Sequence, residues 1–303
     1  MQVNAEHLSK RFGRHGSLED ISFEIKQGVV GLLGQNGAGK STLLKILATV
    51  MPPTRGQVRY DDWKWPGQAH IIRRHLGYLP QIFGLDDEAT GREFLRYAAM
   101  MKGIRPSSEV RRVADDLLEE VGLSEAGGVR LGQYSGGMRQ RIALAQGLIG
   151  IPELLILDEP TAGLDPKERT QLKTLLSLRA RTATVIISTH IVSDLEDLAD
   201  TIIVMADGRM RAMATPQAIA ETANGLTYEA IIAESMWTSL SSRWTTRGSY
   251  RHGVAARIRS EGGHIHLRVL AASPPDLSGC IVRQVAPTLE DGYLALTAEV
   301  LAK

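Results

Sequence analysis

One glycine-rich run constrains the fold of this chain more than any other feature. Residues 34–42 read Gly-Gln-Asn-Gly-Ala-Gly-Lys-Ser-Thr, after an apolar run at 29–33 and before a segment with apolar residues at helical spacing. Glycines between a strand and a helix let backbone N–H groups face a phosphate at the helix N-terminus. We therefore predict a phosphate-binding loop made of Gly34, Gln35, Asn36, Gly37, Ala38, Gly39, Lys40, Ser41 and Thr42. In this loop Lys40 is expected to reach the β- and γ-phosphate oxygens, and Ser41 to ligate Mg²⁺.

Two carboxylates follow a second apolar run. Leu154 to Leu157 come directly before Asp158 and Glu159. A buried strand ending there brings both acids to the crevice beside the phosphate-binding loop. Asp158 is then placed for Mg²⁺ and Glu159 for a water molecule. Taken alone, the pair is also compatible with a cap for the next helix, and only the phosphate-binding loop disfavours that alternative.

The spacing of apolar residues indicates how the chain is organised. Short strand-like runs precede the loop, a mostly helical segment covers about 83–150, and strands alternate with helices from 154 to 205, including a helix from Val192. This rhythm is typical of a parallel sheet covered by helices, so the predicted fold class is α/β. After Gly225 the pattern changes to short alternating runs, which predict a small β-rich or α+β domain.

Composition excludes several classes of protein. Across 303 residues, 35 Lys and Arg nearly balance 34 Asp and Glu, so no overall field attracts nucleic acid, and no nucleic-acid partner is expected. The single cysteine, Cys280, cannot form an intramolecular disulfide, which favours a reducing compartment such as the cytoplasm. Apolar runs fall far short of the roughly 20 residues that span a bilayer. The N-terminus has no basic start and no apolar signal region, so we expect no export signal.

Further motifs give the chain a resemblance to a known family. Between the loop and the two acids lies Tyr134-Ser135-Gly136-Gly137-Met138-Arg139-Gln140-Arg141, which looks like the signature of the ATP-binding cassette (ABC) family. The resemblance continues with Gln81 after Tyr78-Leu79-Pro80, with Asp165 in Gly163-Leu164-Asp165-Pro166, and with His190 after Ser188-Thr189. The expected elements occur in order over roughly residues 2–220. Met138 and Val29-Val30 depart from frequent family residues, and neither is interpreted as inactivating.

The resemblance implies a particular architecture. It is that of a P-loop NTPase core of ABC ATPase type, with an antiparallel β subdomain and a helical subdomain at about 83–150. We accordingly predict an ABC ATP-binding domain at 1–224 and a C-terminal accessory domain at 225–303, whose role the sequence leaves open.

The resemblance also implies the cofactors, ATP and Mg²⁺, and roles for residues around them. Lys40 and Mg²⁺ would neutralise phosphate charge, Glu159 would act as general base on the attacking water, and His190 would hold the γ-phosphate and that water in line. Gln81 would ligate Mg²⁺ and report nucleotide occupancy to a partner. Phe12 stands where the family has an aromatic residue that stacks on adenine, although it is also compatible with a core position.

A second subunit is implied by the signature. In the family, Ser135, Gly136 and Gly137 contact the ATP held by the opposite subunit, so two ATP molecules lie in a head-to-tail dimer that Asp165 would link across. Whether the dimer is homomeric or heteromeric stays open. Physically, Ser135 and the glycines offer a hydroxyl and backbone donors at a helix N-terminus, which is a second anion site.

The predicted function is that of an ATP-hydrolysing subunit coupling dimer closure to transport by a separate integral membrane permease. The closing run at 287–294 and details around Gln81 and His190 resemble drug-efflux and antibiotic-resistance ATPases, so the expected direction is export. The expected location is cytoplasmic, on the inner face of the membrane. The alternative is a soluble ABC ATPase acting on a ribosome or DNA, although such proteins usually carry tandem cassettes or a long coiled coil.

Overall fold

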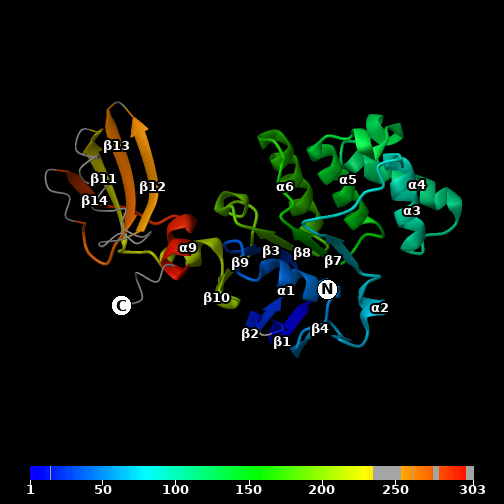
Figure 1. The fold of residues 1–303 in the computed structure, drawn as a ribbon, viewed down its shortest axis with the longest axis horizontal. Helices are drawn as coiled ribbons and strands as arrows, with labels where there is room; N and C mark the ends of the chain where they lie inside the picture. The colour runs from blue at the N-terminus through cyan, green and yellow to red at the C-terminus, as the bar shows by residue number, and fades with distance from the viewer. Residues whose placement is uncertain (14, 235–253, 262, 276–279, 298–303) are drawn as a thin grey trace. The chain divides into compact units, whose positions relative to one another are not determined.

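The computed structural model describes residues 1–13, 15–234, 254–261, 263–275 and 280–297. The chain divides into two compact units, Met1–Met210 and Arg211–Lys303 (Figure 1). This division falls within strand β10 (Arg209–Ala214), whereas the boundary predicted after residue 224 places the next helix, α7 (Pro216–Glu221), with the first domain.

The first unit contains an antiparallel sheet at its N-terminus. Its strand order is β2-β1-β4-β5. Period-two alternation places Val3 and Ala5 of the first strand, and Val58 and Tyr60 of β4, on a buried face. The strands are β1 (Val3–Phe12), β2 (His15–Ile25), β4 (Arg55–Tyr60) and β5 (Trp63–Trp65).

A second sheet of six strands forms the centre of this unit, in the order β10-β9-β3-β8-β7-β6. The pairs β6–β7, β7–β8, β8–β3 and β3–β9 are parallel. Every residue of β7 and of β8 is buried, as expected for parallel strands covered on both faces. The strands are β3 (Gly28–Leu33), β6 (Leu76–Leu79), β7 (Leu154–Asp158), β8 (Thr184–Thr189), β9 (Thr201–Ala206) and β10.

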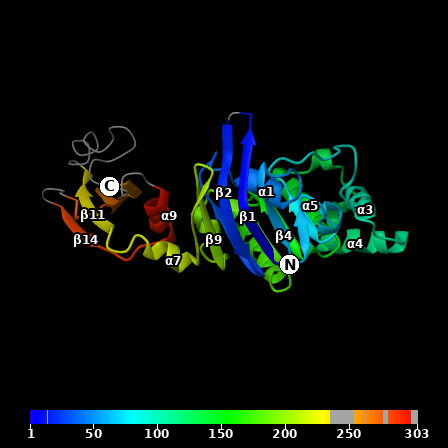
Figure 2. The same cartoon turned by 90° about the horizontal axis from the view of Figure 1, so that it is seen from below.

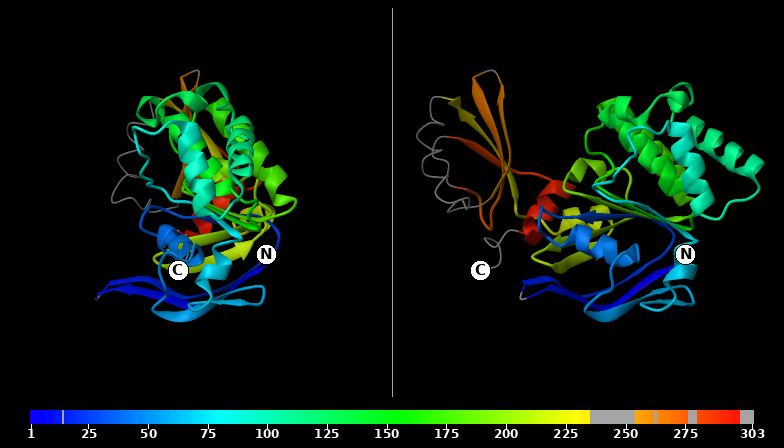
Figure 3. Two further views of the ribbon diagram at one scale, coloured as in Figure 1. Left: turned by 90° about the vertical axis from the view of Figure 1, so that its right-hand side faces the viewer. Right: turned by 45° about the vertical axis from the view of Figure 1, so that its right-hand side comes forward.

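Helices cover both faces of the six-stranded sheet. Helix α1 (Lys40–Leu47) lies between the two sheets, and α6 (Pro166–Ala180) packs on the other face against β3 and β8 (Figures 1 and 3). The carboxyl ends of β3, β6, β7 and β8 therefore meet at one edge, where the loops that follow them can form a site. A single helical turn, α2 (Ala69–Ile72), follows β5.

The helical part of this unit consists of α3, α4 and α5, which pack against one another (Figure 2). Thr90 and Glu93 form a capping box at the start of α3, because each side chain accepts a hydrogen bond from the other's backbone N–H. The elements are α3 (Gly91–Met101), α4 (Ser107–Glu120), the 3₁₀ turns η1 (Glu125–Gly128) and η2 (Leu131–Gln133), and α5 (Gly136–Leu148).

The helix predicted from Val192 is wrong: only a 3₁₀ turn, η3 (Val192–Asp194), begins there. Tertiary contacts replace the helical ladder. The buried Asp194 accepts a hydrogen bond from Thr161 Oγ1 at 2.6 Å, and Leu195 packs so closely on Gly31 that a Cβ there would lie 2.5 Å from Leu195 Cδ1.

The second unit has its own sheet and core. The sheet order is β12-β13-β11-β14, all antiparallel, and alternate side chains such as Tyr228, Ile232, Leu267 and Val269 form a buried cluster. The elements are α7, β11 (Thr227–Ala233), β12 (Val254–Glu261), β13 (His264–Leu270), β14 (Ile281–Gln284) and α9 (Leu289–Thr297).

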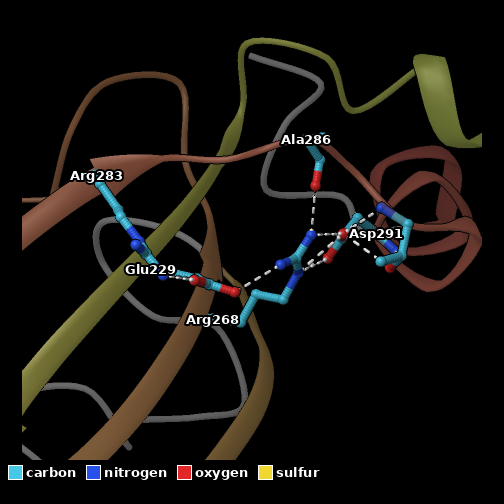
Figure 4. A network of polar contacts seen from close by, with 6 residues as sticks. Glu229, Arg268, Arg283, Ala286 and Asp291 are labelled. Atoms are coloured by element: carbon cyan, nitrogen blue, oxygen red, sulfur yellow. Dashed lines mark hydrogen bonds and ion pairs between the residues drawn. The ribbon is translucent and has the colours of Figure 1, made fainter.

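Contacts with a helix and with the sheet hold α9 in this unit. Gly292 lies so close to α7 that a Cβ would meet Ile219 O at 1.9 Å, so only glycine fits there. Arg268 of β13 reaches across to the fully buried carboxylate of Asp291, with Nη2 and Oδ2 2.8 Å apart (Figure 4). Helix α9 therefore packs on one side against a helix and is fixed to the sheet by an ion pair.

Candidate functional site

The predicted phosphate-binding loop lies between β3 and α1 and needs glycine at defined positions. Gly39 has φ +98°, and a Cβ there would lie 2.8 Å from Ser17 O. At Gly34 a Cβ would lie 2.5 Å from Met205 O. Only glycine fits at both positions, because Gly39 combines a positive φ with a close approach of backbone, and a Cβ at Gly34 would clash with a backbone oxygen. The loop can therefore curl tightly before the helix begins. Its N–H groups then lie at the positive end of α1, a favourable place for an anion.

Lys40 is the first residue of α1, and its side chain is almost completely buried. Its ammonium group donates to Gly34 O at 2.6 Å and to Gln35 O at 3.1 Å, and lies 4.0 Å from Glu159 Oε1. Burial lowers the pKa of Lys40, an effect that the charges of Glu159 and Asp158 oppose. The loop therefore holds a cation within reach of an anion bound in front of it.

Asp158 is the last residue of β7 and is buried. Its Oδ1 accepts a hydrogen bond from Ser188 Oγ. Its Oδ2 is buried and has no hydrogen-bond partner within the described parts of the chain. A buried carboxylate oxygen without a partner is costly unless something else binds it, and Mg²⁺ prefers such oxygen ligands. Asp158 therefore fits the predicted metal, with the Ser41 hydroxyl as a second oxygen donor in the adjoining loop.

Glu159 follows in a left-handed conformation, with φ +53°. Its N–H donates to both Ser188 O and Ser188 Oγ, each at 3.1 Å. Its buried carboxylate lies with both oxygens 3.0 Å from His190 Nδ1, whereas the His190 side chain is half exposed. A carboxylate held next to an imidazole at the mouth of a phosphate site is suited to orient and deprotonate a water molecule.

A cavity of about 280 Å³ brings several predicted residues together. Gln81, in the loop after β6, faces the phosphate-binding loop and Glu159 across it, and Ser17 joins them from β2. The lining residues are Ser17, Gln35, Asn36, Gly37, Gly39, Lys40, Ser41, Thr42, Gln81 and Glu159.

Other predicted site residues do not line this cavity. Phe12 is 50% exposed at the end of β1, where Lys10 Nζ lies 5.4 Å from the centre of its ring. Ser135 and Asp165 each cap a helix: Ser135 Oγ accepts from Met138 N at 3.2 Å, and Asp165 Oδ1 accepts from Glu168 N at 2.8 Å. Of the signature residues, Ser135 and Gly136 are exposed and Gly137 is buried.

Three residues that contact the site or its motifs were not predicted from the sequence. Ser17 Oγ donates to Thr42 Oγ1 at 2.9 Å, Ser188 bonds to both acids, and Glu168 pairs with Arg141, their atoms Oε1 and Nη2 lying 3.3 Å apart. Only Ser188 gave a signal, as a hydroxyl near the end of an apolar strand, two residues before His190. Ser17 and Glu168 stand in ordinary polar positions.

Together, the glycine loop with its buried lysine and the two acids at the next strand's end define a phosphate-loop nucleotide hydrolase. Comparison with known proteins makes this specific. Residues 18–162 match the sequence profile of the family described as ABC transporter. The daunorubicin resistance ATP-binding protein DrrA3 of Streptomyces coeruleorubidus is 34% identical over 235 residues, which are 77% of this chain and 74% of that protein.

Two further comparisons agree. Nod factor export ATP-binding protein I of Rhizobium johnstonii is 39% identical over 225 residues, or 72% of this chain and 71% of that protein. A dimeric, post-hydrolysis structure of an ATP-binding cassette bound to ADP and Pi has a TM-score of 0.65 at 28% identity, over 70% of this chain and 98% of that chain. The chain belongs to the ABC transporter ATP-binding proteins, and it is an ATP-binding ATPase. The predicted fold class and enzyme class are confirmed.

Within the described residues, no helix combines the length and the apolar character that crossing a bilayer requires.

Proposed function

We propose that this chain is the ATP-hydrolysing subunit of an exporter that works with a separate integral membrane permease. The observation that carries the proposal is the cavity where Lys40, Ser41, Gln81 and Glu159 face one another beside the unpartnered oxygen of Asp158. The names of the relatives, one a resistance protein and one an export protein, support the outward direction. The protein would act at the cytoplasmic face of the membrane, bound there through the permease.

The proposed chemistry is phosphoryl transfer from ATP to water. Asp158, Ser41 and Gln81 would hold Mg²⁺, which supplies charge neutralisation for the phosphates when bound. Lys40 binds the β- and γ-phosphate oxygens in place of its present carbonyl partners. Glu159 accepts the proton of the attacking water, and His190 orients the γ-phosphate and that water molecule. Phe12 would stack on the adenine ring.

The working unit is proposed to be a head-to-tail dimer. No signature residue lines the cavity of a single subunit. Ser135 and Gly136 are exposed at the start of α5, so the hydroxyl and backbone N–H donors there are free to contact a ligand held by another subunit. A facing subunit would supply Ser135, Gly136 and Gly137 to each ATP, and Asp165 would connect the two sites. The dimeric structure of a related cassette supports a dimeric working unit.

A second groove, of about 680 Å³, is the proposed docking site for the permease. Its walls combine exposed apolar side chains, Tyr97 (61% exposed) and Met101 (71%), with the cations Arg73, Arg74 and Lys102. No carboxylate is among its lining residues in the described chain. We therefore propose that an amphipathic, acidic segment of the permease binds in this groove. Tyr78 also lines the groove, and its strand β6 pairs with β7, which ends at Asp158, so the groove adjoins the proposed metal site.

The test is co-purification of a tagged Glu159→Gln protein from membranes in ATP. Removing the base while keeping its shape is expected to lower the rate of ATP hydrolysis by at least about 100-fold and to leave ATP binding intact. The closed dimer should therefore accumulate. Recovery of a polytopic membrane protein supports the proposal. Recovery of ribosomes or nucleic acid without a membrane protein would overturn it in favour of a soluble target.

The groove has its own test. Met101→Glu places a carboxylate among apolar side chains that would be covered on docking, so it is expected to abolish recovery of the permease while the isolated protein still hydrolyses ATP. Leu178→Glu is the matched control, because Leu178 is also exposed (55%) but lies on α6, outside the groove. Equal loss of the permease in both variants would contradict this docking site.

A further inference from the structure

Ser188 is the second-to-last residue of β8. Its side chain is completely buried, and it lies beside Asp158 in the parallel pairing of β7 with β8. Its hydroxyl contacts both members of the acidic pair: it donates to Asp158 Oδ1 and accepts from Glu159 N at 3.1 Å. No other hydroxyl among the described residues bonds to both acids.

The first of these bonds selects an oxygen of Asp158. A hydroxyl has one proton to donate, and here that proton goes to Oδ1. The other oxygen, Oδ2, is left buried and without a partner among the described residues. The serine thus fixes the carboxylate so that one oxygen is occupied by protein and the other is available for a ligand.

The second bond fixes the backbone of Glu159. A left-handed conformation is unfavourable for a residue with a Cβ, and it persists only where surrounding contacts hold it. The N–H of Glu159 is shared between Ser188 O and Ser188 Oγ. With the backbone turned this way, the Glu159 carboxylate lies 3.0 Å from His190 Nδ1 and 4.0 Å from Lys40 Nζ.

We infer that Ser188 is a positioning residue that aligns the metal-binding oxygen of Asp158 and the catalytic carboxylate of Glu159 through one hydroxyl. The inference rests on the proposed role of Asp158 in binding Mg²⁺. A serine that only stabilised the strand would affect nucleotide binding equally with and without the metal. A serine that orients Asp158 would affect only the gain in nucleotide affinity that Mg²⁺ provides.

The experiment measures binding of the non-hydrolysable analogue AMP-PNP, in EDTA and in Mg²⁺, together with the kinetics of ATP hydrolysis. For Ser188→Ala we expect the affinity in EDTA to stay within about twofold of wild type, because the loop residues that hold the phosphates are unchanged. The gain in affinity on adding Mg²⁺ is expected to fall about tenfold. We expect kcat to fall more than tenfold with a smaller change in KM, because the base is also misplaced.

Three further variants make the result specific. Ser188→Thr keeps the hydroxyl and is expected to restore most of the Mg²⁺ effect. Ser188→Cys keeps the shape but offers a weaker donor, so it is expected to lie between serine and alanine, and it serves if the alanine protein does not fold. Thr184→Val removes another buried hydroxyl from β8, one that donates to Met1 O, and is expected to leave the Mg²⁺ effect unchanged.

The outcomes separate this inference from the proposed function. A wild-type protein that gains no affinity from Mg²⁺ would overturn the proposed metal site itself. A wild-type protein that responds to Mg²⁺, with Ser188→Ala responding equally, would overturn the positioning role alone. Loss of affinity in EDTA and in Mg²⁺ to the same extent would show that the serine is merely structural.

Discussion

The ionisation of Glu229, in the second unit, depends on the two arginine side chains that bind its carboxylate. Its carboxylate accepts hydrogen bonds from Arg283 Nη2 at 3.0 Å and Arg268 Nη1 at 2.9 Å (Figure 4). The hydrogen bond from Arg283, followed by the bond and charge of Arg268, lowers the pKa of Glu229 in the folded protein. Folding therefore favours the ionised form of this group.

A pH-dependent contribution to stability follows. Because the folded pKa lies below the unfolded value, the contribution is present above the unfolded pKa and is lost as pH falls through the folded pKa. Glu229→Gln is expected to lower the free energy of unfolding at pH 7 by about 1 kcal/mol or less, since the pair is partly exposed. The difference from wild type should shrink below pH 4, as measured by thermal unfolding at both pH values. A difference independent of pH would contradict the assignment, and Arg283→Gln should remove most of the pH effect.

At the scale of elements, α5 and α6 are joined by Glu168. Its Oε2 accepts from Asp165 N at 3.2 Å, its Oε1 lies 3.3 Å from Arg141 Nη2, and Gly137 packs directly against it. A Cβ on Gly137 would lie 2.6 Å from Glu168 Oε2, whereas a Cβ on Gly136 would meet nothing within 4 Å. The two signature glycines are therefore expected to differ, although they are neighbours at the start of one helix.

Alanine substitution tests this difference. Gly→Ala in a helix gains up to about 1 kcal/mol from propensity, so Gly136→Ala should be neutral or slightly stabilising. Gly137→Ala should be less stable than Gly136→Ala by about 1 kcal/mol, because Glu168 must give up one of its two contacts. Chemical denaturation of the nucleotide-free protein provides the measurement. In a Glu168→Ala background the gap should close, and a gap that persisted there would rule out the contact as its cause.

The same elements show what sequence can and cannot predict. Strands β7 and β8 and the loop after β3 follow from apolar runs and glycine spacing, which are local properties. The turn at Val192 and helix α9 were not predicted as such, since their form depends on contacts with Thr161 and Ile219 that lie far away in sequence. Glu168 was not predicted either, because its contact with Arg141 joins two helices that lie apart in sequence, although its capping role is local. Ser188 is visible in the sequence, yet its two bonds appear only when β7 and β8 pair.

For the whole molecule, the division into two units predicts that each can lose stability without the other. All residues of the proposed nucleotide site lie in Met1–Met210, whereas the second unit has a separate hydrophobic core. Asp291 is the buried anchor of that second unit: it pairs with Arg268, whose side chain is only 14% exposed, and accepts from Thr288 N and Oγ1. Removing its carboxylate leaves a buried cation with fewer partners.

Asp291→Ala is therefore expected to destabilise the second unit by about 3 kcal/mol, toward the lower end for a broken buried pair because Glu229 and Ala286 O still hold Arg268. Arg283→Ala, at an exposed position of the same network, should cost less than about 1 kcal/mol.

Calorimetry of Asp291→Ala should show an early transition that ATP does not move and a later one that ATP raises, because a ligand stabilises only the unit that binds it. Nucleotide affinity at 25 °C should equal that of wild type. A single transition, shifted as a whole by both the substitution and ATP, would mean that the two units fold as one cooperative body and that the accessory unit contributes directly to the stability of the ATPase.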